Sequence, residues 1–303
     1  MAQSITWTEI IKRFENYLKL ERSLSENSVA AYIADITKLK QFAQQQPSPL
    51  AVTQISTVDL QNFLVFLHDL GIQPRSQARI ISGIKAFFKF LLFEEIREHD
   101  PAALLEGPRL GRRLPDTLSY EEIEKIIQAI DHATPHGARD RAVVETLYSS
   151  GLRVSELLAL KKGDIHFDVG FLRIRGKGNK ERLVPIGTSA MKYLKIYIDQ
   201  VRSSLAIKPG FETTVFLNLR GSKLSRVSVF NLIKDLVAKA GLTKNVSPHT
   251  FRHSFATHLI EGGADLRAVQ QMLGHESITT TEIYTHLDRD YLRQVITEFH
   301  PRS

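Results

Sequence analysis

The sequence predicts a mainly α-helical protein of two domains, a small all-α domain and a mostly α domain with a small antiparallel β-sheet. Three observations predict this fold class. Apolar residues recur at helical spacing from Trp7 almost to the end of the chain. Proline and glycine interrupt that periodicity across residues 101–115, and two β-type segments flank the turn GKGNK. With 303 residues and 43% hydrophobic content, each domain has enough apolar side chains for a core.

Residues 1–108 are predicted to form a four-helix domain. The second helix follows a capping signal at Ser25, the third covers about 57–70, and the fourth runs from Ser76 to about Phe93. The apolar positions that define the first, second and fourth helices are Trp7, Ile10, Ile11, Phe14 and Leu18; Val29, Tyr32, Ile33, Ile36 and Leu39; and Ile80, Ile81, Ile84, Phe87, Phe88 and Leu91.

Residues 109–117 are predicted to be the linker, because proline, glycine and three arginines replace the periodic pattern there. The second domain then covers 118–303. It opens with a capping box from Ser119 to Glu122, and its hairpin strands are FLRIR and ERLVPI. Helices are expected near 188–204 and 225–240, and the remainder of the chain is expected to be almost wholly helical.

The charge is unevenly distributed along the chain. The net charge is +7, and residues 1–108 hold 11 Lys plus Arg against 12 Asp plus Glu, whereas residues 109–303 hold 29 against 21. A basic excess in the second domain allows a polyanionic partner, although plain soluble proteins also carry such an excess. The absence of cysteine excludes disulfides and thiolate metal sites. Without a signal sequence or an apolar run of membrane-spanning length, the chain is expected to be cytoplasmic.

The segment HTFRHSFATHLI, residues 249–260, concentrates nitrogen at the start of a predicted helix. His249, Arg252 and His253 are three and four residues apart, so they can lie on one face. A zinc site is disfavoured, because Thr250 occupies the place of the glutamate in the metalloprotease pattern and Arg252 would repel a dication. His253, nearest the apolar run, is the better candidate for a buried structural histidine.

Four other residues complete a candidate set. Arg153 begins a short helix with Glu156 three residues later, a spacing at which a carboxylate can steady a guanidinium. Lys177 lies between two glycines at the hairpin tip, and His275 and Tyr284 follow in LGHESITTTEIYTH. Taken singly, each has a plainer structural interpretation as a surface ion pair, a turn or a core aromatic.

Together these residues suit phosphoryl transfer at a DNA phosphodiester. Two guanidiniums match the charge that spreads over the nonbridging oxygens in the transition state. Tyrosine becomes a usable nucleophile against a neutralised phosphate, a lysine on the hairpin can protonate the departing 5′ oxygen, and histidines supply hydrogen bonds and proton transfer. Because the bond energy stays in a phosphotyrosine, no nucleotide cofactor is required.

No cofactor or metal is expected. The segment GFLRIRGKG differs from a phosphate-binding loop, because five residues instead of four separate its glycines and Gly178 replaces the Ser or Thr after the lysine. The clustered carboxylates that hold magnesium in metal-dependent nucleases are also missing from this region.

In these motifs the chain resembles the tyrosine site-specific recombinases, also called the λ-integrase family, and is most similar to the bacterial Xer recombinases. The resemblance covers nearly the whole chain. It implies a four-helix SAM-like core-binding domain, a catalytic domain, and catalysis by six residues, with Tyr284 as the nucleophile that forms a 3′-phosphotyrosine. The motifs that carry them are GLRVSELLAL, the hairpin turn, HTFRHSFATHL, LGH and TTTEIYTH, and the residues are Arg153, Lys177, His249, Arg252, His275 and Tyr284.

The resemblance also implies partners. Double-stranded DNA would contact a polar strip on the fourth helix, which comprises Arg75, Arg79, Ser82, Lys85 and Lys89. Periodicity alone favours a solvated face for this strip. Four protomers would assemble on two DNA sites, with copies of this chain or with a second recombinase. The stripe of Tyr291, Leu292, Val295 and Ile296 suits docking on a neighbour or, equally, on its own domain.

The chain begins at the core-binding domain, which favours the Xer type that resolves chromosome dimers at cell division. A mobile-element integrase and a non-catalytic DNA-binding regulator with the same fold are the alternatives. The DNA target, the order of strand cleavage and the need for a DNA translocase stay open.

Overall fold

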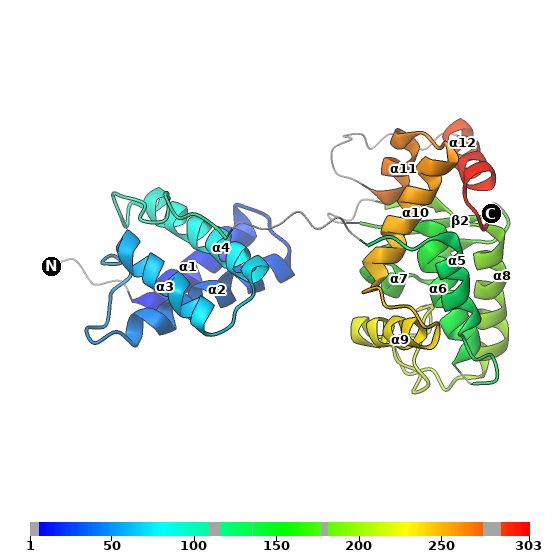
Figure 1. Cartoon of the computed structure of the whole chain (residues 1–303), viewed down its shortest axis with the longest axis horizontal. Coiled ribbons are helices and arrows are strands. Elements are labelled where there is room, and N and C mark those ends of the chain that lie inside the picture. Colours follow the sequence, from blue (N-terminus) through cyan, green and yellow to red (C-terminus); the bar gives the residue numbers. More distant parts are fainter. Residues whose placement is uncertain (1–5, 109–115, 135, 177–180, 275–285) are drawn as a thin grey trace. The chain divides into compact units, whose positions relative to one another are not determined.

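A computed structural model describes residues 6–108, 116–134, 136–176, 181–274 and 286–303. Contacts within the chain divide it into two compact units, Met1–Arg113 and Leu114–Ser303. The first unit is helical and the second combines helices with a three-stranded sheet (Figure 1). The mainly α fold class predicted from periodicity is confirmed.

The first unit consists of helices that start at recognisable caps. Thr6 and Ser56 begin α1 and α3 with capping boxes, and Ser25 caps α2 as its position predicts. The helix bounds are α1 Trp7–Leu20, α2 Glu26–Gln44, α3 Thr57–Asp69 and α4 Pro74–Phe93. Helix α4 starts two residues earlier than Ser76, because Pro74 occupies its first turn, where a missing N–H costs nothing.

Aromatic side chains form the centre of this unit's core. Phe87 of α4 packs edge-on against Phe14 of α1, with ring centroids 5.2 Å apart, and parallel to Trp7. The indole of Trp7 also donates a 3.0 Å hydrogen bond to the carbonyl of Leu50, so its one polar atom is satisfied. The buried face of α4 thus holds α1 in place, and its other face is left toward solvent.

The second unit is organised around helix α6, which is buried on nearly all sides. It packs against α8 and α10, and α12 packs against α10 and strand β3 (Figure 1). The bounds are α5 Tyr120–Gln128, α6 Gly137–Ser150, α7 Val154–Ala159, β1 Ile165–His166, β2 Phe171–Arg175, β3 Glu181–Pro185, α8 Thr188–Ile196, α9 Arg226–Lys239, α10 Pro248–Gly262, α11 Leu266–Leu273 and α12 His286–Phe299.

The sheet is antiparallel, in the order β1-β2-β3. The predicted hairpin is β2 and β3, and the short strand β1 adds a third member that its two residues do not reveal in the sequence. The predicted helix near 188–204 is α8, which continues as a π-helical turn at Tyr197–Val201 and a 3₁₀ turn at Arg202–Ser204. No helix in the described ranges combines the length and apolarity that a membrane crossing needs.

Helix α12 and the residues after it are held by their own domain. Leu292, Val295 and Ile296 are 1–3% exposed and belong to the core of the second unit. After the helix, Arg302 forms a bidentate ion pair with the fully buried Glu145, with distances of 2.6 and 3.0 Å. Within the single chain, the apolar stripe packs on its own domain, with Tyr291 exposed at the edge.

Candidate active site

Arg153 is positioned by a sharp turn between α6 and α7. Gly151 ends α6 in the left-handed conformation, with φ of 58°, and a Cβ there would lie 2.5 Å from the ring of Phe255 on α10. Only glycine lets the chain pass so close to α10 at this point. Arg153 then caps the N-terminus of α7, with 40% of its side chain exposed.

Glu156 fixes Arg153 from one turn into α7. The backbone N–H of Arg153 donates to Oε2 of Glu156 at 2.8 Å, and Nη1 of Arg153 donates to Oε1 at 2.9 Å. The spacing of three residues therefore forms the carboxylate–guanidinium pair that it predicts. The carboxylate is 6% exposed, so this pair is better shielded than an ordinary surface ion pair.

Arg252 reaches the same place from α10. Its Nη1 donates to the carbonyl of Gly151 at 2.8 Å and its Nη2 to the carbonyl of Leu273 at 2.7 Å. Burial, followed by the nearby positive charge of Arg153, lowers the pKa of Arg252 to about 10. The side chain stays charged at neutral pH, and the structure brings the guanidiniums of Arg153 and Arg252 together.

A third arginine, which the sequence analysis missed, completes this cluster. Arg182 of β3 is buried and pairs with Glu156 through two parallel hydrogen bonds of 2.8 and 3.0 Å. Its Nε donates to the carbonyl of Met272 at 3.0 Å. One signal could have found it: Arg182 alternates with the apolar Val184 along β3, so it occupies an inward-facing position of the strand.

Two opposing effects act on the pKa of Glu156. Burial alone would raise it, but the hydrogen bonds and charge of Arg182, together with those of Arg153, lower it below its usual range. Glu156 is therefore ionised at neutral pH and holds two guanidiniums at once.

The histidines of α10 differ in their surroundings. His249 is exposed in the first turn of the helix, three residues before Arg252. The expectation that His253 is buried is wrong, because it is exposed. Phe251, Phe255 and Leu259 face the core, and a residue two positions from Phe251 lies on the opposite side of a helix. The buried histidine is instead His300, at 3% exposure between the rings of Tyr148 and Phe255.

Lys177, His275 and Tyr284 lie outside the described residues. The nearest described elements are β2, which Arg175 ends, β3, which Glu181 starts, and α11, which Gly274 follows. Gly274 has φ of 67°, and a Cβ there would lie 3.1 Å from the guanidinium of Arg182. Of the six candidate catalytic residues, Arg153 and Arg252 thus share one cluster with Glu156.

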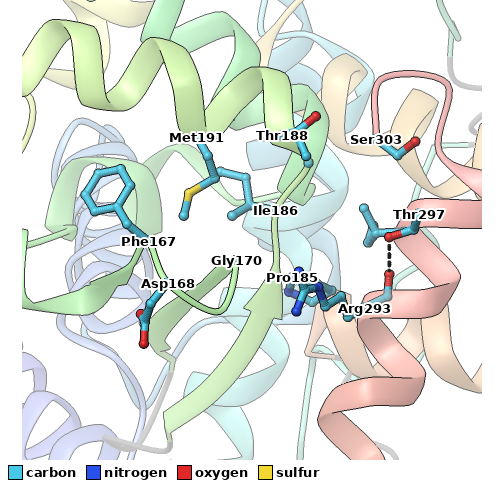
Figure 2. A pocket seen from close by; sticks show the side chains of 12 residues that line it. Phe167, Asp168, Gly170, Pro185, Ile186, Thr188, Met191, Arg293, Thr297 and Ser303 are labelled. Atoms are coloured by element: carbon cyan, nitrogen blue, oxygen red, sulfur yellow. Dashed lines mark hydrogen bonds between the residues drawn. The ribbon is translucent and has the colours of Figure 1, made fainter.

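No group of three or more His, Asp or Glu side chains that could hold a metal ion occurs among the described residues. A cavity of about 360 Å³ lies elsewhere in this unit, between the turn after β1, the start of α8 and one side of α12. Figure 2 shows Phe167 and Met191 on one side of it and Arg293 and Thr297 of α12 on another. None of the described candidate catalytic residues lines this cavity.

The predicted DNA-binding strip lies on α4 in the first unit. Arg75, Ser82 and Lys89 are exposed, and Lys85 is half-buried, with its Nζ 3.5 Å from the carbonyl of Ala103. Arg79 is 46% exposed, but both of its terminal nitrogens bind the carboxylate of Asp35, which is fully buried on α2. Burial raises the pKa of Asp35, although the hydrogen bonds and charge of Arg79 oppose this. Arg79 therefore also stabilises the α2–α4 contact.

Comparisons with known proteins match both units. Residues 116–290 match the phage integrase family, and residues 11–95 match the phage integrase N-terminal SAM-like domain. The tyrosine recombinase XerD of Staphylococcus saprophyticus is 43% identical over 97% of this chain and 99% of its own length. That of Chlorobaculum tepidum is 43% identical over 98% of each chain.

Solved structures agree with this match. The XerH site-specific recombinase bound to a palindromic difH substrate, in a post-cleavage complex, is 26% identical with a TM-score of 0.69. The alignment covers 95% of this chain and 84% of that one. A λ integrase dimer bound to a COC′ core site shares the fold, with 20% identity, a TM-score of 0.70, and coverage of 96% and 78%.

Proposed function

The chain belongs to the phage integrase family of tyrosine recombinases, and we propose that it resolves chromosome dimers at a dif-like DNA site before cell division. Site-specific recombination follows from the family and from XerD relatives that match nearly the whole chain. The XerH relative that was crystallised with difH DNA supports the finer proposal of a dif-like site.

One observation carries the proposed chemistry: Arg153 and Arg252 present two guanidiniums in one cluster. In the proposed reaction they bind the nonbridging oxygens of the scissile phosphate, where negative charge grows in the transition state. The oxygen of Tyr284 attacks phosphorus, and the bond from phosphorus to the 5′ oxygen breaks. Lys177 protonates that 5′ oxygen, and His249 and His275 hydrogen-bond to the phosphate and move protons.

The reverse step restores the DNA backbone. A 5′ hydroxyl from the partner duplex attacks the 3′-phosphotyrosyl bond and releases Tyr284, so no metal ion or nucleotide is consumed. Four protomers would act on two sites, either with copies of this chain or with a XerC-like partner, and a DNA translocase would be an activator. Arg75 and Lys89, which are exposed on α4, and Lys85, which is half-buried there, would neutralise backbone phosphates.

Covalent trapping tests this function. A duplex that carries the site protected by the protein in its own chromosome is nicked next to the scissile phosphate, so that the released fragment diffuses away. The wild-type chain should then accumulate as a protein–DNA adduct that resists denaturant, also in excess EDTA. Tyr284→Phe should abolish the adduct. Tyr291→Phe, which removes an exposed phenol seven residues later, is the matched control and should retain it.

The same experiment separates the alternatives. A DNA-binding regulator would give salt-sensitive complexes and no adduct. A metal-dependent phosphoesterase would lose activity in EDTA. A mobile-element integrase would form the adduct but would protect a site at the ends of an inserted element and not one near the replication terminus.

A further inference from the structure

We propose that Arg182 is a positioning residue for DNA strand cleavage, which acts by holding Glu156 and, through it, Arg153. This proposal rests on the proposed function. Its basis is the C-terminal end of α11, where three consecutive carbonyl oxygens each accept from a different arginine. Met272 accepts from Arg182 at 3.0 Å, Leu273 from Arg252 at 2.7 Å, and Gly274 from Arg153 at 3.5 Å.

The end of a helix is a natural place to gather cations. Its last carbonyl groups have no partner inside the helix, and the helix dipole adds negative potential there. Arg182 differs from the other two arginines because it is almost fully buried, at 9% side-chain exposure against 40% for Arg153. Arg182 therefore belongs to the support of the site, whereas Arg153 is open enough to meet a phosphate.

Glu156 connects the two arginines atom by atom. Its Oε1 accepts from Nη1 of Arg153 and Nη1 of Arg182, and its Oε2 accepts from the backbone N–H of Arg153 and Nη2 of Arg182. Each carboxylate oxygen is thus shared between both residues. Without Arg182, the carboxylate loses half of its hydrogen bonds in a buried place, so its orientation toward Arg153 is no longer determined.

Only arginine has donors in the directions needed here. Nη1 and Nη2 form a planar fork that matches the carboxylate, and Nε points to the carbonyl of Met272. Lysine would keep the charge but could not make these three bonds from one rigid group. The left-handed Gly274 packs against the same guanidinium, so Arg182 also supports the backbone from which the segment with His275 departs.

The test measures cleavage and binding separately. In a single-turnover assay on the nicked duplex, Arg182→Met should lower the rate of adduct formation by about 100-fold, as expected when a reacting group is misplaced by about 1 Å. Affinity for the intact duplex should stay at the wild-type value, because Arg182 is buried. Arg182→Lys should recover part of the rate. Rates are compared well below each variant's melting temperature.

Arg173→Met is the matched control, because Arg173 lies on the neighbouring strand β2 and pairs with a different carboxylate, that of Asp164. It should cleave at the wild-type rate. A second test is a double-mutant cycle: if Arg182 acts through Glu156, then Arg182→Met should cost little further in a Glu156→Gln background. Losses that multiply, or wild-type cleavage by Arg182→Met, would overturn the inference.

The outcomes are distinguishable from failure of the proposed function. A wild-type chain that forms no adduct would overturn both the function and this inference. An adduct that forms equally well in Arg182→Met would overturn the inference alone. Should Arg182→Met fail to fold, Arg182→Lys decides, since slower cleavage at an unchanged melting temperature supports positioning and an unchanged rate contradicts it.

Discussion

The carbonyl oxygen of Leu273 accepts a 2.7 Å hydrogen bond from Nη2 of Arg252, which joins the end of α11 to the first turns of α10. The other terminal nitrogen of Arg252 reaches Gly151, two residues before Arg153. Arg252 is therefore the residue that joins the turn carrying Arg153 to the backbone that leads to His275.

Arg153→Ala and Arg252→Ala should each lower the rate of adduct formation by about 10²- to 10³-fold, the cost of removing one group that stabilises developing negative charge. DNA affinity should change much less, since many phosphate contacts contribute to it. Single-turnover cleavage and equilibrium binding, measured on the same duplex, check this. Equal losses in both would mean that the arginine serves binding and not the chemical step.

Lys89→Ala should weaken binding to all duplexes alike and reduce the slope of log affinity against log salt by about one, because one phosphate contact is lost. Its melting temperature should not change, since the side chain is exposed. Titrations at several salt concentrations measure the slope. An unchanged slope would assign Lys89 to a solvated face.

Arg79→Ala should behave differently from Lys89→Ala, because it leaves the buried carboxylate of Asp35 without its main partner. We expect a loss of about 1–3 kcal/mol in the stability of the first unit. Lys38, 3.8 Å from the same carboxylate, limits the loss. Denaturant unfolding checks the value, and the double change Asp35→Asn with Arg79→Ala should recover part of it.

His300 should make the second unit sensitive to acid. Burial lowers its pKa to about 3, whereas an unfolded histidine has a pKa near 6.5. Above pH 6.5 neither state binds the proton, so stability is full. As the pH falls from 6.5 toward 3, only the unfolded state gains the proton, and stability is lost. At pH 5 this loss is about 2 kcal/mol.

The matched variant for this prediction is His300→Asn, which does not titrate in this range and keeps an acceptor for the backbone N–H of Arg302. Its free energy of unfolding should depend less on pH between 7 and 5 than that of the wild type. If the free energy of unfolding falls equally with pH in the two proteins, His300 does not cause the loss of stability in acid.

Arg302→Met should loosen α12, because Glu145 is fully buried and loses its bidentate partner. The expected cost is about 3 kcal/mol, at the lower end for a broken buried pair, since Arg141 remains bonded to Glu145. Hydrogen exchange over residues 289–299 should accelerate. Unchanged protection there would mean that Leu292, Val295 and Ile296 hold the helix without help from the tail.

The sequence predicts those parts of the fold and site that depend on short separations. Capping at Ser25 and Ser119, the hairpin strands and the pair Arg153–Glu156 all involve residues a few positions apart, and the structure contains each of them. His253 shows the limit of this reasoning. Two histidines at helical spacing give the shared face but not which face is inside, and the phase is set by Phe251 and Phe255.

Longer separations escape local patterns. Arg182 is 26 residues from Glu156 and 90 residues from Met272 in the sequence. The periodicity of a single segment therefore does not predict these two contacts. The partners of Arg79 and Arg302 lie 44 and 157 residues away, at Asp35 and Glu145. Family resemblance predicts which side chains react. The alternation along β3 could have shown that Arg182 faces inward, but its partners are found only once the chain is folded.

Helix α12 buries its side chains Leu292, Val295 and Ile296 on its own domain. This burial has a consequence for how copies of this chain could assemble. A copy that packs this helix on a neighbour leaves uncovered the surface of its own domain on which the helix packs. The helix of another copy must then cover that surface. In a closed ring the helix of a neighbour covers this surface in every copy, so as many apolar side chains are buried as in the separate copies. In an open linear assembly, this surface stays uncovered at one end and the apolar face of the helix stays exposed at the other. Exchange of this helix between copies therefore favours closed rings over open linear assemblies, and it limits the assembly to a finite number of subunits.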